Sequence, residues 1–421
     1  GAKWTRILAY WDQLQPKAPG VKDPGDLDRD GFNDAYVHEL DTVVGALRAQ
    51  HISVILTGAG PPSWARDTAY KKYWTKNQGA AVVRIGDAKV LAAFQKYAKF
   101  LAGHFKAFGV VHFEVWNEPN LRLIPQIVGK KVVGPEVYRK MLVAFSKAAH
   151  KANPRAVVIA GATSRTGSPG TSPGSTSPQW FAKYLKAHDA TRWFNAYSHH
   201  PYNTLRSSPQ PGAPPRRPDI SVTLGNISVL LKLFPTKPFY LTEYCYSTTT
   251  GSNDAFVMTV SQEDQARYLR QAYELAGRYK QIKALLWFLV KDWQSNPQNP
   301  SSVGVFTGLV DQSDRRKPAW YAFIGGNTIT ATPSDSSVAA GAPFTVSGVL
   351  TTKDVPGADL PVLLQRRSLA GGTWSTVATQ PATKTDAAGA YSFSVSQTTG
   401  RQYRVIWDGV CESAARPVTL L

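Results

Sequence analysis

Seven short apolar runs, separated by segments with helical periodicity, constrain the fold of this chain most strongly. Each run is rich in β-branched and aromatic residues and is too short for a buried helix, so each predicts a buried strand. Alternating strands and helices with nearly continuous apolar strands are typical of a parallel sheet covered by helices. The expected strands are Thr5–Trp11, Ile52–Gly58, His112–Trp116, Ala156–Gly161, Phe194–His199, Phe239–Tyr244 and Ala284–Val290.

The number of these units favours a closed (β/α)8 TIM barrel of the α/β class over an open sheet. After residue 321 the sequence pattern changes. Apolar residues now alternate with polar ones, as at Tyr391, Phe393 and Val395. A period of two with glycine turns predicts an all-β, immunoglobulin-like sandwich. We therefore expect a catalytic barrel over residues 1–327 and an accessory sandwich over residues 328–421, which acts as a spacer or as a glycan-binding module.

The chain of 421 residues is 43% hydrophobic, which is enough for one large core and a smaller one. No stretch approaches the roughly 18 consecutive apolar residues of a membrane helix, so we expect no membrane span. Cys245 and Cys411 fall in different predicted domains, and two buried thiols without a disulfide are expected. Cysteine usage leaves the cellular compartment open.

The positive charge is concentrated in the predicted barrel. Residues 1–327 carry 41 basic and 23 acidic residues, a net charge of +18 out of +19 for the whole chain. Such a charge favours anionic partners, but no nucleic-acid-binding module accompanies it, so no nucleic-acid partner is expected. An acidic polysaccharide substrate and simple solubility remain the two interpretations. If the charge is functional, basic side chains should line the cleft, and the candidates are Arg122, Arg206 and Lys291.

Two of the predicted strands lead into glutamates. Glu118 follows one run and Glu243 lies at the end of another. The carboxyl ends of barrel strands converge on one face, and a pair of carboxyl groups about 5 Å apart cleaves glycosidic bonds with retention. We expect Glu118 to be the general acid/base and Glu243 the nucleophile. Glu118 should then have the higher pKa of the pair, because it must donate a proton while Glu243 stays ionised.

Other residues at strand ends are candidates for substrate binding. Asn117 can bond the hydroxyl beside the anomeric carbon, and a cation or donors must keep the nucleophile ionised. The candidates for that second task are Arg6, His200 and Tyr202. Tryptophans that follow strands are either sugar platforms or ordinary rim packing; these are Trp287, Trp11, Trp64 and Trp293.

The ordered motifs resemble a known clan. Trp-Asn-Glu-Pro at residues 116–119 and Thr-Glu-Tyr at residues 242–244 are similar to the retaining glycoside hydrolases with a β/α barrel, whose acid/base and nucleophile end strands four and seven. Residues 113–121 are most similar to glycoside hydrolase family 39, and family 5 is the near alternative. The sequence Tyr244-Cys245-Tyr246 departs from the pattern and leaves the sugar open.

The resemblance also assigns roles to single residues. His200-Pro201-Tyr202 is similar to the His-x-Tyr of the clan after strand six, Arg6 to the strand-two arginine that holds the nucleophile, and Trp287 to the strand-eight tryptophan. This numbering makes the first of the seven runs strand two. The resemblance therefore implies that the first barrel strand is absent from the front of this sequence.

An acidic segment near the start resembles the opening of a calcium-binding loop. Asp26, Asp28 and Asp30 alternate before a glycine, and Asp34 follows. Val37 occupies the position at which such loops carry a bidentate glutamate. A structural calcium ion and a plain acidic loop both fit, and the expected chemistry requires no cofactor.

The sequence as a whole predicts a secreted or cell-surface, monomeric retaining glycoside hydrolase that acts on a polysaccharide or oligosaccharide. The alternatives are a non-catalytic glycan-binding protein on a barrel scaffold and a basic cell-wall adhesin. The sequence leaves the sugar, the linkage and the choice between endo and exo action open.

Overall fold

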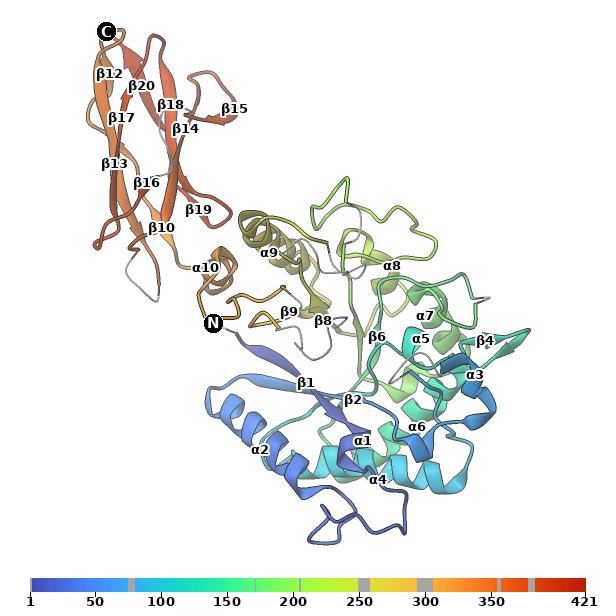
Figure 1. Ribbon diagram of the computed structural model, residues 1–421. Helices are drawn as coiled ribbons and strands as arrows, with labels where there is room; N and C mark the ends of the chain where they lie inside the picture. The colour runs from blue at the N-terminus through green and yellow to red at the C-terminus, as the bar shows by residue number, and fades with distance from the viewer. Residues whose placement is uncertain are drawn as a thin grey trace. The chain divides into compact units, whose positions relative to one another are not determined.

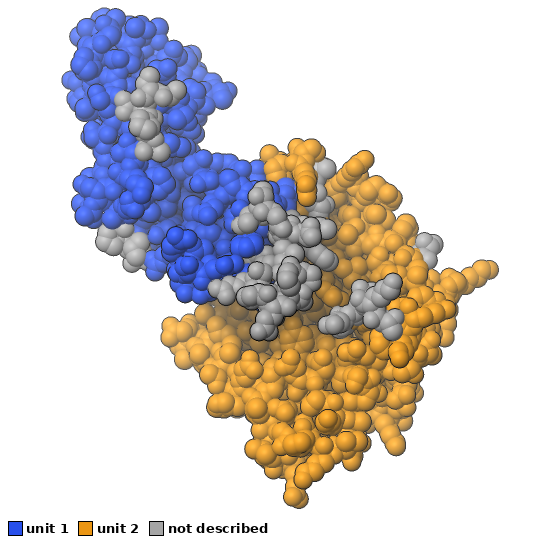
Figure 2. All heavy atoms as spheres, viewed as in Figure 1, with its two compact units in different colours: residues 1, 245–272, 289–421 blue, residues 2–244, 273–288 orange. Residues whose placement is uncertain are grey.

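The computed structural model describes residues 2–74, 80–170, 172–203, 206–248, 258–293, 306–353, 357–377 and 383–421. The chain divides into two compact units (Figure 2). Unit 2 comprises residues 2–244 and 273–288, and unit 1 comprises residue 1 with residues 245–272 and 289–421.

Unit 2 contains a curled, parallel, seven-stranded sheet with the order β1-β2-β3-β6-β7-β8-β9 (Figure 1). Every run that the sequence predicts as a buried strand forms one of these strands, with ends that differ by a few residues. The curled parallel sheet supports a TIM-barrel-like fold. The strands are β1 (Trp4–Tyr10), β2 (Ser53–Ala59), β3 (His112–Glu114), β6 (Val157–Thr163), β7 (Ala196–His199), β8 (Phe239–Tyr244) and β9 (Ile282–Trp287).

β1 and β9 are the two ends of the hydrogen-bonded order, and no ladder joins them within the part of the chain that the structure describes. Glu118 therefore follows the third of the seven strands in chain order. Eight consecutive strands ahead of residue 290 are not observed among the described residues. The absence of a first barrel strand from the sequence stays a prediction.

The helices between the strands bury one apolar face each. In α4, Asp87 caps the first turn by accepting hydrogen bonds from the backbone N–H groups of Lys89 and Val90, at 2.9 and 3.1 Å. Phe94 and Leu101 lie on its buried face, and burying each such side chain contributes about 1.5–3 kcal/mol. The inter-strand helices are α2 (Asp34–Ala49), α4 (Ala88–His104), α6 (Gly134–Ala152), α7 (Pro178–Ala187), α8 (Ser228–Leu231) and α9 (Gln262–Gly277).

Short elements complete the connections of the sheet. They are α1 (Trp11–Leu14), η1 (Ser63–Ala65), η2 (Thr68–Tyr70), α3 (Lys71–Trp74), α5 (Pro119–Arg122), β4 (Ile127–Val128), β5 (Lys131–Val132), η3 (Thr191–Trp193) and η4 (Leu224–Asn226). Most of them lie in loops that follow strand ends, whereas η3 lies between α7 and β7.

The C-terminal part of unit 1 is all-β. Most of its strand pairs are antiparallel and form two sheets, one built around β13 and the other on the path β12-β20-β18-β14-β15. Buried and exposed residues alternate along β13 and β17, as the period of two predicts. An immunoglobulin-like topology is not confirmed. The strands are β10 (Thr328–Ile329), β11 (Thr332–Pro333), β12 (Ser337–Val338), β13 (Pro343–Thr351), β14 (Pro361–Ser368), β15 (Gly371–Thr376), β16 (Thr383–Lys384), β17 (Ala390–Ser396), β18 (Arg401–Trp407), β19 (Cys411–Glu412) and β20 (Arg416–Leu420).

Unit 1 extends beyond these strands because earlier residues pack on them. Arg267 of α9 forms an ion pair with Asp408 at 2.5 Å, and Tyr321 of α10 (Pro318–Ile324) packs its ring on Trp407 with centroids 4.7 Å apart. The first β strand of this region begins at Thr328, the residue at which the sequence analysis places the domain boundary.

Among the described residues, no helix combines the length and the apolar composition that crossing a membrane would require. Both cysteines are thiols; Cys245 is buried and Cys411 is half-buried. Burial raises the pKa of the Cys411 thiol to about 11.

Candidate active site

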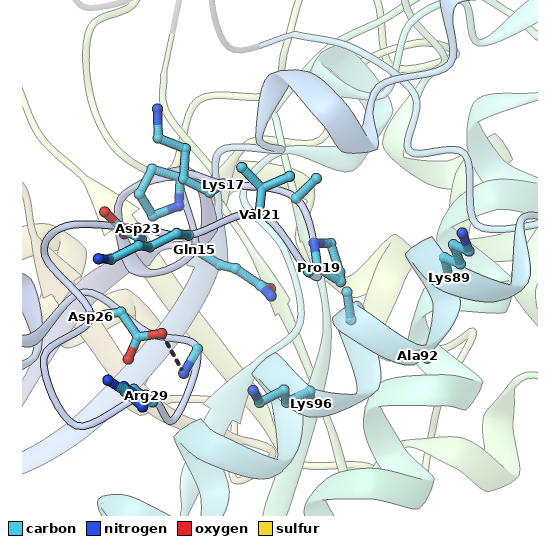
Figure 3. Close-up of a pocket in the computed structure, with 16 residues that line it drawn as sticks. Gln15, Lys17, Pro19, Val21, Asp23, Asp26, Arg29, Lys89, Ala92 and Lys96 are labelled. Carbon is cyan, nitrogen blue, oxygen red and sulfur yellow. Dashed lines mark hydrogen bonds between the residues drawn. The ribbon is translucent and has the colours of Figure 1, made fainter.

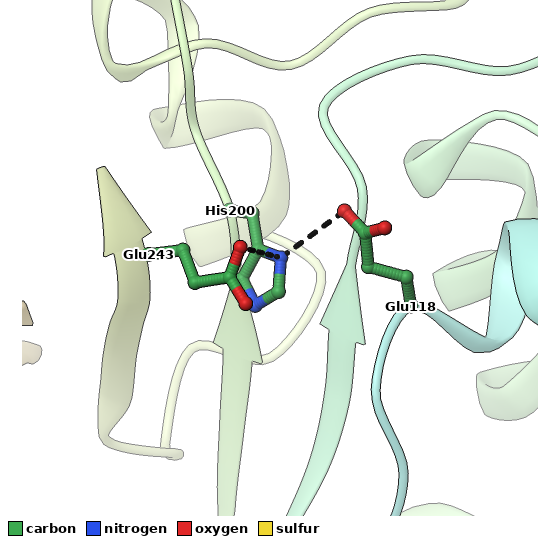
Figure 4. A group of neighbouring side chains, drawn as sticks. All are labelled: Glu118, His200 and Glu243. Carbon is green, nitrogen blue, oxygen red and sulfur yellow. Dashed lines mark hydrogen bonds and ion pairs between the residues drawn. The ribbon is translucent and has the colours of Figure 1, made fainter. Parts of the chain in front are cut away.

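Two glutamates and a histidine from different strands meet at the carboxyl ends of the sheet (Figure 4). One carboxylate oxygen of Glu118, one of Glu243 and one ring nitrogen of His200 all lie within 4.8 Å of one another. His200 Nδ1 lies 3.2 Å from Glu118 Oε1 and 3.4 Å from Glu243 Oε2. Retaining glycosidases hold their carboxyl groups about 5–5.5 Å apart and inverting ones about 6.5–9.5 Å. The two carboxylate oxygens lie within 4.8 Å of each other, which is nearer to the retaining spacing than to the inverting one.

The backbone at Glu118 is unusual and directs its side chain. Glu118 has φ of 44° and ψ of 54°, in the left-handed region, and it is the residue before α5. Pro119 follows it and disfavours a right-handed helical conformation at the preceding residue. The Glu118 N–H donates to Ala162 O at 3.0 Å, which fixes the turn. Such a conformation costs about 1–3 kcal/mol for a residue other than glycine and is concentrated at active sites.

Donors surround the Glu243 carboxylate at the end of β8. Arg6 Nη1 donates to Glu243 Oε1 at 2.5 Å, and Tyr202 Oη donates to Oε2 at 2.7 Å. Burial would lower the pKa of Arg6, but the charges of Glu114 and Glu243 outweigh burial, so the pKa of Arg6 is raised. Hydrogen bonds from ionised or phenolic donors favour the charged carboxylate. The arrangement suits a nucleophile that must stay ionised.

A third carboxylate, Glu114, completes this network, and the sequence analysis did not single it out. Glu114 is 1% exposed and accepts hydrogen bonds from Arg6 Nε at 2.7 Å, Thr57 Oγ1 at 2.8 Å and Thr242 Oγ1 at 3.0 Å. Its position inside an apolar strand was the available signal, because a carboxylate buried there needs a charged partner. The sequence did not show that this partner is Arg6.

Asn117 is bonded to the same arginine as the two carboxylates Glu114 and Glu243. Its Oδ1 accepts a hydrogen bond from Arg6 Nη2 at 2.8 Å, and the residue is half-buried. Within the described residues, Asn117 Nδ2 meets no hydrogen-bond acceptor. The amide N–H groups are therefore the part of this side chain that can donate to a substrate hydroxyl.

The surroundings of Glu118 act on its pKa in opposite directions. Burial raises the pKa of Glu118, but the hydrogen bond and charge of His200, together with the charges of Arg122 and Arg6, lower it by more. The net pKa is below the ordinary value for glutamic acid. His200 Nδ1 lies 3.2 Å from Glu118 Oε1, where it favours the ionised carboxylate. The expectation that Glu118 has the higher pKa of the pair stays a prediction.

The predicted tryptophan platforms fall into different environments. Trp287 is half-buried at the end of β9, with its ring edge-to-face with Tyr244 at 6.3 Å. Trp11 is fully buried, packs on Tyr97 at 5.7 Å and bonds Gln15 Oε1 through Nε1 at 3.1 Å. Because no face of Trp11 remains exposed, its expected role as a sugar platform is wrong, and it serves the core.

The two other tryptophans keep more exposed surface. Trp64 is half-buried, lies edge-to-face against Trp11 at 5.4 Å and donates to Gln15 O at 3.2 Å. Trp293 is 64% exposed and belongs to unit 1, whereas Glu118 and Glu243 belong to unit 2. A role in sugar binding stays a prediction for both residues.

The three basic residues that the sequence suggests as binding an acidic substrate lie in different environments. Arg122 Nε lies 3.9 Å from Glu118 Oε2, and its side chain is 43% exposed. Arg206 is exposed. Lys291 pairs with Asp314 at 2.7 Å and belongs to unit 1. The structure thus places Arg122 beside Glu118.

The acidic loop brings three of its four aspartates together. Single carboxylate oxygens of Asp26, Asp28 and Asp34 lie within 4.8 Å of one another, whereas Asp30 accepts a hydrogen bond from Phe32 N at 2.9 Å. Oxygens of the three grouped aspartates also accept backbone N–H groups of the loop at 2.6–2.9 Å. The donor set is oxygen-only, which suits calcium, and calcium binding stays a prediction.

Comparison with known families agrees with this geometry. The family model described as Cellulase (glycosyl hydrolase family 5) matches residues 1–286 of the chain. No curated protein sequence matches it.

Solved glycosidase structures share the fold at low sequence identity. A hyperthermophilic β-glucosidase from Pyrococcus furiosus superimposes with a TM-score of 0.50 at 13% identity, over 76% of this chain and 79% of that one. A glucosidase from Croceicoccus marinus gives 0.50 at 13% identity, over 93% and 87%. GH5_18 from Streptomyces cattleya, in complex with GlcNAc, gives 0.50 at 15% identity, over 80% and 74%. At these identities the likeness concerns the fold.

Proposed function

We propose that this chain, which belongs to glycosyl hydrolase family 5, hydrolyses an oligosaccharide or polysaccharide by double displacement through a covalent glycosyl-enzyme intermediate. Family 5 was the near alternative in the motif comparison, and the resemblance to family 39 is not confirmed. The observation that carries the proposal is the approach of the Glu118 and Glu243 carboxylates within 4.8 Å, with His200 between them.

In the first half of the reaction, Glu243 attacks the anomeric carbon. Arg6 and Tyr202 hold its two oxygens and orient the attacking lone pair. Glu118 in its acid form gives its proton to the leaving glycosidic oxygen as that bond breaks. An ester between Glu243 and the sugar and a free alcohol on the leaving group result.

In the second half, the Glu118 carboxylate removes a proton from water, whose oxygen attacks the anomeric carbon and releases Glu243. Two inversions at one carbon give net retention. Asn117 Nδ2 is placed to bond the hydroxyl next to the anomeric carbon, a contact that strengthens in the transition state. Trp287 offers an indole face for the sugar ring.

The stereochemistry of the product tests the mechanism. An aryl β-glycoside should give the β-anomer as first product, which proton NMR resolves before mutarotation. Glu243→Gly should lose activity and regain it with azide as a glycosyl azide of inverted configuration. A first product of α-configuration from the native enzyme would overturn the assignment of Glu243 as nucleophile.

Two non-catalytic alternatives make different predictions. A glycan-binding barrel would bind sugar equally well in the native protein and in Glu243→Gln and would release no product in either. A basic adhesin would bind polyanions in a salt-sensitive way, independently of Glu118 and Glu243. The hydrogen-bonded carboxylate pair supports the enzyme over both.

Arg122 supports an acidic glycan as the substrate. Its guanidinium lies 3.9 Å from the acid/base carboxylate, near the position of the leaving group. An anionic substituent there would pair with Arg122 and reduce its hold on Glu118. Turnover of a uronic substrate should fall with salt more steeply than turnover of a neutral one; equal salt dependence would dismiss the idea. We also propose a secreted or cell-surface location and action as a monomer.

A further inference from the structure

Unit 2 contains a hollow that is separate from Glu118 and Glu243. Its cavity volume is about 730 Å³, and none of the catalytic residues lines it. The loop of residues 15–31 forms one wall, and the first turns of α4 form the other (Figure 3). This loop continues from α1, which follows the carboxyl end of β1, the strand that carries Arg6. The hollow therefore belongs to the same end of the sheet as the catalytic carboxylates.

The charges that line the hollow are mostly positive. Five cationic and two acidic side chains give it a net charge of +3. None of the five cations forms an ion pair within the described residues. All five are exposed; they are Lys17, Lys22, Arg29, Lys89 and Lys96.

The two acidic side chains are already engaged by backbone groups. Asp23 Oδ1 accepts from Gly25 N at 3.0 Å, and Asp26 Oδ2 accepts from Gly31 N at 2.9 Å. These bonds engage one oxygen of each carboxylate and shape the loop, whereas Asp26 Oδ1 is buried without a hydrogen-bond partner among the described residues. Lys96 and Lys89 act on the carboxylates of Asp30 and Asp87 from beyond ion-pair distance. Because none of the five cations is in a direct ion pair among the described residues, their potential acts on an anionic ligand.

The remaining lining is aliphatic. Val21, Pro19 and Ala92 present carbon surface between the charged groups, and no aromatic side chain is among the residues that line the hollow. Single-stranded nucleic acids bind on stacking platforms of aromatic residues, and such a platform is absent from this fully described lining. Aliphatic surface rimmed by cations suits sugar rings that carry acidic groups.

We propose that this hollow is a second binding site for a polysaccharide that bears carboxylate or sulfate groups, and that it holds a segment of the polymer outside the catalytic cleft. The choice of a glycan rests on the hydrolase function proposed above. The volume admits about one or two sugar units, since a small-ligand pocket typically measures about 300–1,000 Å³. Binding here would raise the local concentration of the polymer at the cleft without contacting the reacting atoms.

A binding measurement on an inactive background tests this proposal. Glu243→Gln would keep the polymer intact during titration. Onto it we would place Lys17→Gln with Lys89→Gln, two exposed cations of the hollow. The matched control is Lys99→Gln with Lys106→Gln, which removes two exposed charges from α4 and its C-terminal end, outside the hollow.

The probes are polygalacturonate, dextran sulfate and neutral dextran, measured by calorimetry at low salt. We expect the hollow variant to bind both anionic polymers about tenfold more weakly than the control, with a slope of log affinity against log salt that is smaller by about 1.5. Neutral dextran should show no difference between the variants. If the hollow variant lost affinity for polygalacturonate alone, the site would bind carboxylate groups. If it lost affinity for dextran sulfate alone, the site would bind sulfate groups.

Equal binding of the anionic polymers by the two double variants would overturn the proposal. The proposal would also be overturned if a single-stranded DNA 20-mer bound as tightly as the anionic polysaccharides and the hollow variant lost this binding. That result would favour a nucleic-acid site. Hydrolysis of a small aryl glycoside by both lysine variants, with Glu243 intact, is measured in parallel. If the native enzyme did not hydrolyse the aryl glycoside, the result would count against the hydrolase function. The binding comparison would still decide whether the hollow binds anionic polymers.

Discussion

Replacing Glu114 by glutamine tests how the buried network supports catalysis. The change keeps the size of the side chain and removes one negative charge beside Arg6. In the free enzyme, Arg6 would lose a charge-assisted partner at 2.7 Å but keep Glu243 at 2.5 Å. The loss of one hydrogen bond to a charged group costs about 1.5–3 kcal/mol.

The cost is larger in the glycosyl-enzyme intermediate. There Glu243 is an ester and carries no charge, so Glu114 is the carboxylate left to balance the buried Arg6. An uncompensated buried charge costs about 3–5 kcal/mol. The intermediate is therefore destabilised by about 2 kcal/mol more than the free enzyme, which corresponds to a decrease of about 10- to 30-fold in the rate of glycosylation.

Burst kinetics with a 2,4-dinitrophenyl glycoside would measure this step directly, and thermal melting would report the loss of stability. The matched control is Glu136→Gln on α6, which removes a carboxylate paired with Arg139 at 2.8 Å, away from Arg6. We expect its glycosylation rate to stay within twofold of native. A Glu114→Gln enzyme that melts earlier but glycosylates at the native rate would show that Glu114 only stabilises the fold, and would refute the charge argument.

Further outcomes follow from other parts of the site. His200→Asn should raise the pKa of Glu118, since burial would then dominate. The basic limb of the pH profile of kcat/KM should therefore move to higher pH. A basic limb at the native pH would contradict the lowering of this pKa by His200. Trp287→Ala should raise KM severalfold and change kcat by less than threefold in steady-state assays; a reverse pattern would place Trp287 in the chemistry rather than in binding. Calcium at about 100 times its dissociation constant should stabilise the native protein by about 2.7 kcal/mol over an EDTA-treated sample, and Asp26→Asn with Asp28→Asn should abolish the difference; identical melting with and without calcium would dismiss the ion.

The sequence predicted the strands and the proximity of Glu118 and Glu243 because both depend on local signals. A short apolar run such as Phe239–Tyr244 has few alternatives to a buried strand, and the observed β8 has the same bounds. The carboxyl ends of parallel strands meet at one edge, so Glu118 and Glu243 could be paired from their positions alone. These predictions needed no knowledge of which helix covers which face.

The remaining features depend on contacts that sequence spacing does not encode. Trp11 follows a strand as a platform would, but the chain turns at once into α1 and buries its ring against Tyr97, 86 positions away. Glu114 is part of the motif, yet its role depends on Arg6, which lies 108 positions earlier. The lowered pKa of Glu118 depends in the same way on His200.

The lowered pKa of Glu118 is compatible with an acid role when the occupied cleft is considered. Burial pushes this pKa up, and the hydrogen bond and charge of His200 reverse the effect, with Arg122 and Arg6 adding to it. His200 Nδ1 lies almost equally far from Glu118 and Glu243, at 3.2 and 3.4 Å, so a small displacement changes which carboxylate it favours. We infer that a sugar bound over Glu243 would exclude water and move the Glu118 side chain toward the leaving oxygen, which would lengthen its contact with His200. Burial then dominates, and Glu118 holds its proton where the reaction needs it.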